Sequence, residues 1–151
     1  MKKLALFLAI GFGIGFGLSS CVEGDDEIRG GNGNGSNPAQ KDRPSVSIQE
    51  SPGNYVQMND SVNFQLLVKS NSTTSKLKSV KMEVFKKQGG SFTALPSLMK
   101  SEKKTGRTTA GQLFGLTISN QNFKLRDSIR VKFTVNTTNG LSASKKQEMV
   151  V

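Results

Sequence analysis

The chain of 151 residues has no histidine and no tryptophan, and it contains one cysteine and one tyrosine. Without histidine it cannot form a catalytic triad with an imidazole base, and it lacks the commonest metal ligand of proteins. A single cysteine cannot form a disulfide within the chain. The shortage of aromatic rings also disfavours a cleft for neutral sugars. We therefore expect no enzyme, no cofactor and no metal site.

Long hydrophobic segments are equally scarce. One run of 15 apolar and glycine residues, 4–18, follows Lys2 and Lys3. It is shorter than the roughly 20 residues that a membrane-spanning helix needs, and its alternate glycines weaken it as a permanent helix. A cationic start followed by such a run is the layout of a secretory signal. A transmembrane anchor and an ordinary cleaved signal are the alternatives.

The run ends in Leu18-Ser19-Ser20-Cys21, whereas an ordinary secretory signal would end in an Ala-x-Ala-like site. This tetrapeptide resembles the lipobox of bacterial lipoproteins. The resemblance implies that the Cys21 thiol is acylated with diacylglycerol and that signal peptidase II cuts just before it. Residues 1–20 are then a cleaved signal peptide. Two or more acyl chains are enough for stable attachment to a membrane.

Residues 21–43 are expected to form a tether. Residues 22–27 contain four acids, similar to the acidic export tag after the lipidated cysteine in surface lipoproteins of one Gram-negative phylum. A solvated spacer is the alternative. Val22 also differs from the aspartate that resembles the inner-membrane retention signal of enteric lipoproteins. These resemblances imply an outer-membrane lipoprotein facing the cell exterior. Residues 30–38, rich in Gly and Asn, predict a flexible coil.

From residue 44 onward, apolar and polar residues alternate in short runs, which is the period of β-strands. We expect clear strands around 46–48, 62–68, 80–84 and 129–135, weaker ones at 92–95, 98–100 and 113–118, and a polar loop at 101–111. Asn139-Gly140 predicts a hairpin leading to a last strand that runs to residue 151. About seven short strands predict an all-β fold, a single antiparallel immunoglobulin-like β-sandwich spanning residues 44–151.

Two turns share a pattern, Asn59-Asp60-Ser61-Val62 and Arg126-Asp127-Ser128-Ile129. They resemble the starts of strands B and F in immunoglobulin-like and PKD-like modules of bacterial surface proteins. The order acid, hydroxyl, aliphatic also resembles the O-glycosylation acceptor of the same Gram-negative phylum. That second resemblance makes Ser61 and Ser128 candidate glycosylation sites. Ordinary turn chemistry is the alternative, because Asp and Ser side chains bond readily to nearby backbone groups.

Motifs of known enzymes match the chain only in fragments. Ser97 and Lys100 fit the Ser-x-x-Lys of penicillin-recognising enzymes, but three other Ser-x-x-Lys matches occur in this chain, and no Ser-Asp-Asn element accompanies them. Gly106 and Gly111 have Walker-like spacing, yet Gln112 stands where the lysine must be. The acids from residue 44 onward are scattered singly, which indicates neither a calcium site nor a glycosidase pair.

The charge is the most informative property of the predicted domain. From residue 44 onward it has 16 Lys and Arg against six acids. Solubility and protection of sheet edges are one explanation. The other is a cationic face. In an immunoglobulin-like layout the strands around 80–84 and 129–135 belong to one sheet, so Lys81, Arg130 and Lys132 would line its outer face together.

Two functions fit these observations. The first is a lipid-anchored, non-catalytic interaction or structural module, accessory to an outer-membrane complex through an unknown protein partner. The second is a binder of anionic glycan or lipopolysaccharide through the basic sheet face. Nucleic acid is disfavoured, because lysines without stacking aromatics attract it unselectively. An exposed apolar patch would favour the protein partner, and a continuous basic surface would favour the polyanion.

Overall fold

A computed structural model describes residues 42–151, and the signal peptide, Cys21 and most of the tether predicted from the sequence lie outside the described residues. The described chain contains eight strands and one 3₁₀ helix. In chain order they are β1 (Ser45–Glu50), β2 (Ser61–Lys69), β3 (Leu77–Gln88), β4 (Ser91–Ala94), η2 (Pro96–Leu98), β5 (Lys100–Lys103), β6 (Thr109–Thr117), β7 (Ser128–Thr137) and β8 (Ser142–Val150).

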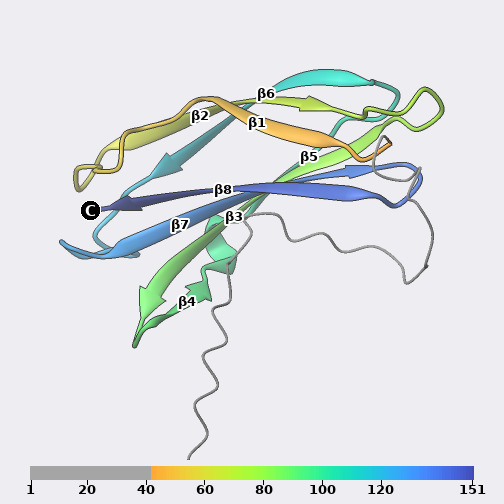
Figure 1. The fold of residues 1–151 in the computed structure, drawn as a ribbon. Coiled ribbons are helices and arrows are strands. Elements are labelled where there is room, and N and C mark those ends of the chain that lie inside the picture. The colour runs from red at the N-terminus through yellow and green to blue at the C-terminus, as the bar shows by residue number, and fades with distance from the viewer. Residues whose placement is uncertain (1–41) are drawn as a thin grey trace, which may run out of the picture.

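The strands form two facing antiparallel sheets (Figure 1). One sheet has the order β1-β2-β6. The other has the order β4-β3-β7-β8, and β5 pairs with the same edge of β3 as β4. The chain crosses between the sheets three times, from β2 to β3, from β5 to β6 and from β6 to β7, as in a Greek-key sandwich. The predicted all-β, immunoglobulin-like sandwich is confirmed, and the third and seventh strands are neighbours in one sheet as expected.

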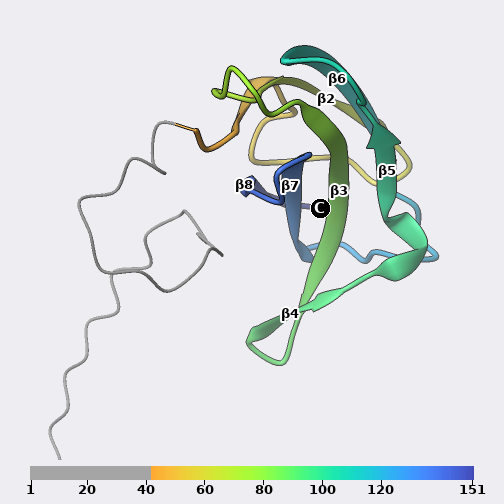
Figure 2. The same ribbon diagram turned by 90° about the vertical axis from the view of Figure 1, so that its right-hand side faces the viewer.

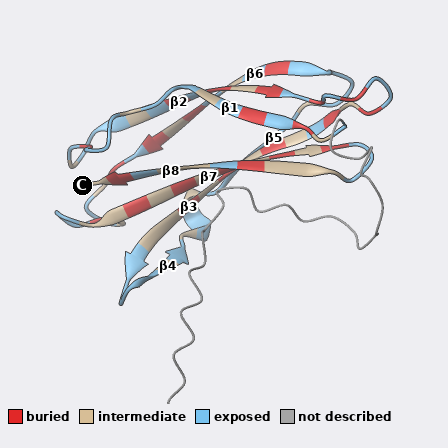
Figure 3. Cartoon of the chain, viewed as in Figure 1, coloured by how far each residue is buried: buried red, intermediate tan, exposed pale blue. Residues whose placement is uncertain are grey.

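The core lies between the sheets and is built by the alternation seen in the sequence. In β7 every second residue is buried, and β2 and β3 repeat this pattern (Figure 3). Phe133 of β7 is fully buried between two other rings. Its centroid is 5.1 Å from that of Phe64 on β2 and 6.2 Å from that of Phe114 on β6. These contacts join the two sheets at their centre.

The sequence prediction was wrong between residues 98 and 111. Leu98 ends the 3₁₀ helix instead of beginning a strand, β5 occupies Lys100–Lys103, and β6 begins at Thr109. Every residue of β5 is exposed, so this short edge strand pairs with β3 through its backbone and leaves no apolar alternation to detect. At the start of β6, Ala110 is the one residue that contributes to the core before Phe114.

The two Asp-Ser turns are confirmed as strand starts, and they share one geometry. Asn59 and Arg126 both have positive φ, 69° and 71°. The N–H of Asn59 donates to the carbonyl of Ile118 (2.6 Å), and the N–H of Arg126 donates to the carbonyl of Val151 (2.6 Å). Each turn is therefore fastened to the end of the neighbouring strand. The Asn-Gly hairpin also forms, with Gly140 at φ 83°.

Candidate functional site: a cationic end of the sandwich

The three cations predicted to share a face lie together on the outside of the five-stranded sheet. Lys81 on β3 and Arg130 and Lys132 on β7 alternate with buried residues, so they point away from the core. All three are partly exposed. The sequence therefore located them correctly, and the remaining question is whether their charge is available to a ligand.

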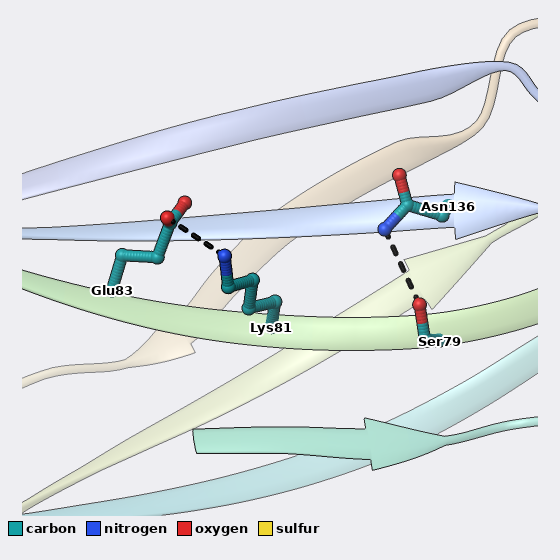
Figure 4. A network of polar contacts seen from close by, with 4 residues as sticks. All are labelled: Ser79, Lys81, Glu83 and Asn136. Atoms are coloured by element: carbon teal, nitrogen blue, oxygen red, sulfur yellow. Dashed lines mark hydrogen bonds and ion pairs between the residues drawn. The ribbon is translucent and has the colours of Figure 1, made fainter. Parts of the chain in front are cut away.

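Acids on the same face neutralise part of that charge. The Lys81 Nζ lies 2.9 Å from Glu83 Oε1 (Figure 4). The Arg130 Nη2 lies 2.6 Å from Glu148 Oε1 on the neighbouring strand, and the guanidinium carbon is 3.9 Å from the centre of the Phe92 ring. Lys81 and Arg130 are thus paired within the sheet. The face carries mixed charge instead of a continuous positive surface.

A denser group of cations lies at one end of the sandwich, on the right in Figure 1 and toward the viewer in Figure 2. It is formed where β2 ends, β3 begins and β5 turns into β6. We call this group the basic end. Its members are Lys69, Lys76, Lys78, Lys103, Lys104 and Arg107.

Backbone hydrogen bonds bring these segments together although 25 residues separate them in the sequence. The N–H of Lys104 donates to the carbonyl of Lys78 (3.0 Å), and the N–H of Leu77 donates to the carbonyl of Arg107 (2.7 Å). The end of β2 is in turn paired with the start of β6. The six cations are consequently positioned by ladders of the fold and not by a single loop.

A cluster of buried hydroxyls fixes the loop between β2 and β3. Ser70, Ser72 and Ser75 are all buried. The Ser70 hydroxyl donates to the Ser75 carbonyl (2.6 Å), and the Ser72 hydroxyl accepts from the Ser75 N–H (3.2 Å). The hydroxyl of Thr138, in the hairpin between β7 and β8, accepts from the N–H of Lys76 (3.1 Å). Because the polar groups satisfy one another, the loop holds Lys76, its one lysine, without an ion pair recorded among residues 42–151.

The basic end has few acids beside it: Glu102 precedes Lys103 in β5, and Asp42 precedes Arg43. Segments 69–78, 103–109 and 137–142 have no Asp or Glu. Within residues 42–151 the three recorded ion pairs all lie elsewhere. Lys69, Lys78, Lys103 and Arg107 are exposed, and the other two members are partly exposed. This is the electrostatic pattern expected of a surface that attracts anions.

Sequence reasoning missed the basic end because it depends on strand register. The lysines at 76 and 78 and the cations at 103–107 look like two unrelated runs until β5 is paired with β3. One signal was available. The stretch 69–81 has four lysines and no acid, and 103–107 has three cations and no acid. Acid-free cationic runs on both sides of one strand pair would have indicated a shared surface.

The opposite end of the sandwich is organised around one partly buried ion pair. Lys86 Nζ on β3 lies 2.7 Å from Asp127 Oδ2, with side-chain exposures of 15% and 18%. The same carboxylate accepts from the Lys124 N–H (2.6 Å). Burial raises the pKa of Asp127, but the Lys86 hydrogen bond, the backbone bond and the nearby lysine charges outweigh it and lower the pKa below its ordinary value.

The candidate glycosylation sites also lie at that opposite end, because β2 and β7 both start there (Figure 1). Ser61 is exposed, and its hydroxyl lies 3.3 Å from that of Thr117. Ser128 is partly buried and is paired with Val150. A transferase would therefore reach the Ser61 hydroxyl more readily than that of Ser128.

A groove of about 690 Å³ runs along the side of the sandwich between β1 and β8, the edge strands of the two sheets. Residues 43–49 and 51 form one wall, and residues 142–147 form the other. Neither edge continues into another described strand along this stretch. Unpaired sheet edges offer backbone donors and acceptors to an extended segment.

Other kinds of site are not seen in the part of the chain that the structure describes. Within residues 42–151, no three potential metal ligands among His, Cys, Asp and Glu come together. Over the same residues, no helix has the length and hydrophobicity that a membrane crossing requires. The exposed large apolar side chains, Tyr55, Met99, Leu113 and Leu125, lie on four different segments.

No protein-family model matches the chain, and no curated protein matches it. Among solved structures, it is similar to the sporulation control protein Spo0M from Bacillus subtilis, with 10% sequence identity and a TM-score of 0.46. The similarity covers 72% of this chain and 48% of Spo0M, so the chain spans about half the length of that protein.

Proposed function

We propose that this protein is a lipid-anchored, non-catalytic module of the outer membrane that faces the cell exterior and binds an anionic glycan or lipopolysaccharide. The lipobox and acidic segment of the sequence support the anchor and the location. The basic end carries the binding part of the proposal, because it gathers six cations that have no recorded ion pair among residues 42–151 and that outnumber the nearby acids Asp42 and Glu102. It replaces the ion-paired sheet face as the binding surface.

Binding of purified protein to lipopolysaccharide, with heparin as a soluble polyanion probe, tests this function. Neutralising Lys78, Lys103 and Arg107 as K78Q, K103Q and R107Q should weaken binding strongly. The matched control neutralises three exposed cations away from the basic end, K87Q, K124Q and R126Q. Binding should also weaken as salt rises, because the Debye length shrinks from about 10 Å at 0.1 M to about 3 Å at 1 M. Equal loss in both triple variants would contradict a dedicated surface.

A second candidate function is an accessory of an outer-membrane protein complex, and the groove between β1 and β8 favours it. An extended segment of a partner could add to either edge strand. Cross-linking and affinity purification from detergent-solubilised membranes would identify such a partner. Gln49→Arg places a charge in the groove wall, and Gln65→Arg places the same charge on an exposed position of the neighbouring strand outside the groove. The partner should be lost with the first variant and retained with the second.

A further inference from the structure

We infer that the basic end is the membrane-facing end of the module, and that it docks on the anionic lipid headgroups of the same membrane that holds the anchor. This inference rests on the proposed attachment at Cys21 and on the proposed anion-binding role of the basic end. It goes further by naming the anion as a lipid surface and by fixing the orientation of the sandwich.

The chain joins the sandwich beside the loop between β2 and β3. The Asn71 side-chain amide donates to the Arg43 carbonyl (2.8 Å), and Ser45 is opposite Lys69 in the β1–β2 register. Residue 43 is therefore held beside the loop between β2 and β3. The segment that links Cys21 to the sandwich reaches the fold at its basic end and not at the opposite one.

The expected reach of the tether is short compared with the sandwich. A Gly-rich coil of 23 residues, the number from Cys21 to Arg43, would have a root-mean-square end-to-end distance of about 25 Å. Strand β3, with 12 residues, extends about 40 Å at about 3.3 Å per residue. The average reach expected of the tether is thus shorter than the long dimension of the sandwich, although a fully extended tether would be longer. On average the end at which it is attached therefore lies nearer the bilayer than the opposite end.

The cations of the basic end are attracted to anionic lipid. Anionic lipid surfaces attract each nearby Lys or Arg, and each such contact favours the docked state about fivefold. The attraction is limited to about one Debye length, roughly 8 Å at physiological ionic strength. Six cations on adjacent segments can enter this layer together, because they outnumber the acids beside them, Asp42 and Glu102. A mixed-charge face such as the outside of the five-stranded sheet would gain much less.

The segments that carry these cations are already held in place by hydrogen bonds. The hydroxyl cluster of Ser70, Ser72, Ser75 and Thr138 already orders the loop that carries Lys76. The segment carrying Lys104 and Arg107 is bonded to the start of β3. Docking therefore requires little further ordering of the backbone, which is one of the main costs of association.

Energy transfer on vesicles tests the orientation with the full-length lipidated protein. Because Cys21 is acylated, an introduced cysteine is the single free thiol available for a donor dye. Thr105→Cys labels the basic end, and Gln121→Cys labels an exposed position in the loop between β6 and β7 at the opposite end. The acceptor is a headgroup-labelled lipid. Vesicles contain either phosphatidylcholine alone or phosphatidylcholine with phosphatidylglycerol.

With phosphatidylglycerol, transfer from position 105 should greatly exceed transfer from position 121. High salt, or vesicles without phosphatidylglycerol, should reduce this excess to the small difference set by the tether. The variant K78Q, K103Q, R107Q should lower the ratio of docked to undocked protein on the order of 100-fold, at about fivefold per charge. The matched variant K87Q, K124Q, R126Q should leave that ratio unchanged.

Co-flotation with the vesicles separates the possible failures. Protein that does not float lacks the anchor, which overturns the proposed function at its base. Protein that floats but transfers equally from both positions overturns the docking inference alone. The inference is also overturned if energy transfer from position 105 does not respond to lipid charge but changes when the four acids of residues 23–27 are replaced by their amides. In that case the acidic segment of the same chain, and not the membrane, occupies the basic end.

Discussion

Lys86 and Asp127 are joined by an ion pair of 2.7 Å between β3 and the start of β7, and both side chains are largely buried. The Lys86 ammonium also donates to the Asn122 carbonyl (3.3 Å), and the Asp127 carboxylate accepts from the Lys124 N–H. This pair fixes the loop before β7 to the neighbouring strand. Asp60, at the equivalent turn before β2, has no recorded ion pair among residues 42–151.

The difference between the two aspartates gives a matched test. Asp127→Ala should lower the free energy of unfolding by about 1–3 kcal/mol, because it removes charged hydrogen bonds and leaves Lys86 without its anion. Asp60→Ala should cost less than about 0.5 kcal/mol, as is usual for an exposed residue. Urea unfolding at neutral pH measures both values. Equal losses would show that the turn geometry, and not the ion pair, is what stabilises this region.

The same carboxylate should make stability depend on pH. The folded state lowers the pKa of Asp127, so its contribution is present above the unfolded pKa of about 3.9 and is lost as the pH falls through the folded pKa. We therefore expect the free energy of unfolding to decrease at pH values below about 4. Asp127→Ala should remove this part of the slope. A series of urea titrations between neutral and strongly acidic pH, with Asp60→Ala as the control, measures the difference.

Phe133 should be among the most costly positions to truncate. Its ring is fully buried and packs against the rings of Phe64 on β2 and Phe114 on β6 of the opposite sheet. Phe133→Ala should lower the free energy of unfolding by roughly 3–5 kcal/mol. Leu113→Ala, at a side chain that is 62% exposed, should change it little. A loss below about 1 kcal/mol for Phe133→Ala would contradict the observed core.

Cys21→Ala tests the anchor. Without the thiol no diacylglycerol can be attached, so the variant should accumulate as an uncleaved precursor or be misplaced. Membrane fractionation and metabolic labelling with a radioactive fatty acid decide the outcome. Ser20→Ala, which leaves the thiol in place, is the control. If the Cys21 variant fractionates and labels like the parent, the lipoprotein assignment is wrong.

Intact-mass analysis of protein from its native host tests glycosylation. If the Asp-Ser motifs are acceptors, the mature mass should exceed that of the polypeptide and its acyl chains. Ser61→Ala should remove the larger share of the excess, because Ser61 is exposed while Ser128 is partly buried. The control is Ser91→Ala, at an exposed serine that no Asp precedes. A mass explained by polypeptide and acyl chains alone would leave both motifs as turns.

The sequence predicted the strands that contribute to the core, because burial imposes alternation on them. Residues 62–68 and 129–135 show this directly. It did not predict β5, whose four residues are all exposed. It placed Lys81, Arg130 and Lys132 on the correct face but did not predict that Glu83 pairs with Lys81 and Glu148 with Arg130. The Arg130–Glu148 pair and the basic end both depend on register between strands, and composition carries no information on register; the Lys81–Glu83 pair lies within one strand and could have been inferred from the alternation.

The buried serines beneath the basic end separate two properties that are often coupled. The loop between β2 and β3 keeps its shape through neutral hydroxyls, so the charge of Lys76, its one lysine, is not needed to hold it. Substitution of surface cations there would alter the electrostatic potential without disturbing the scaffold. Point mutations can therefore change the charge of this end, and with it any anion binding, while the buried hydroxyls keep the fold.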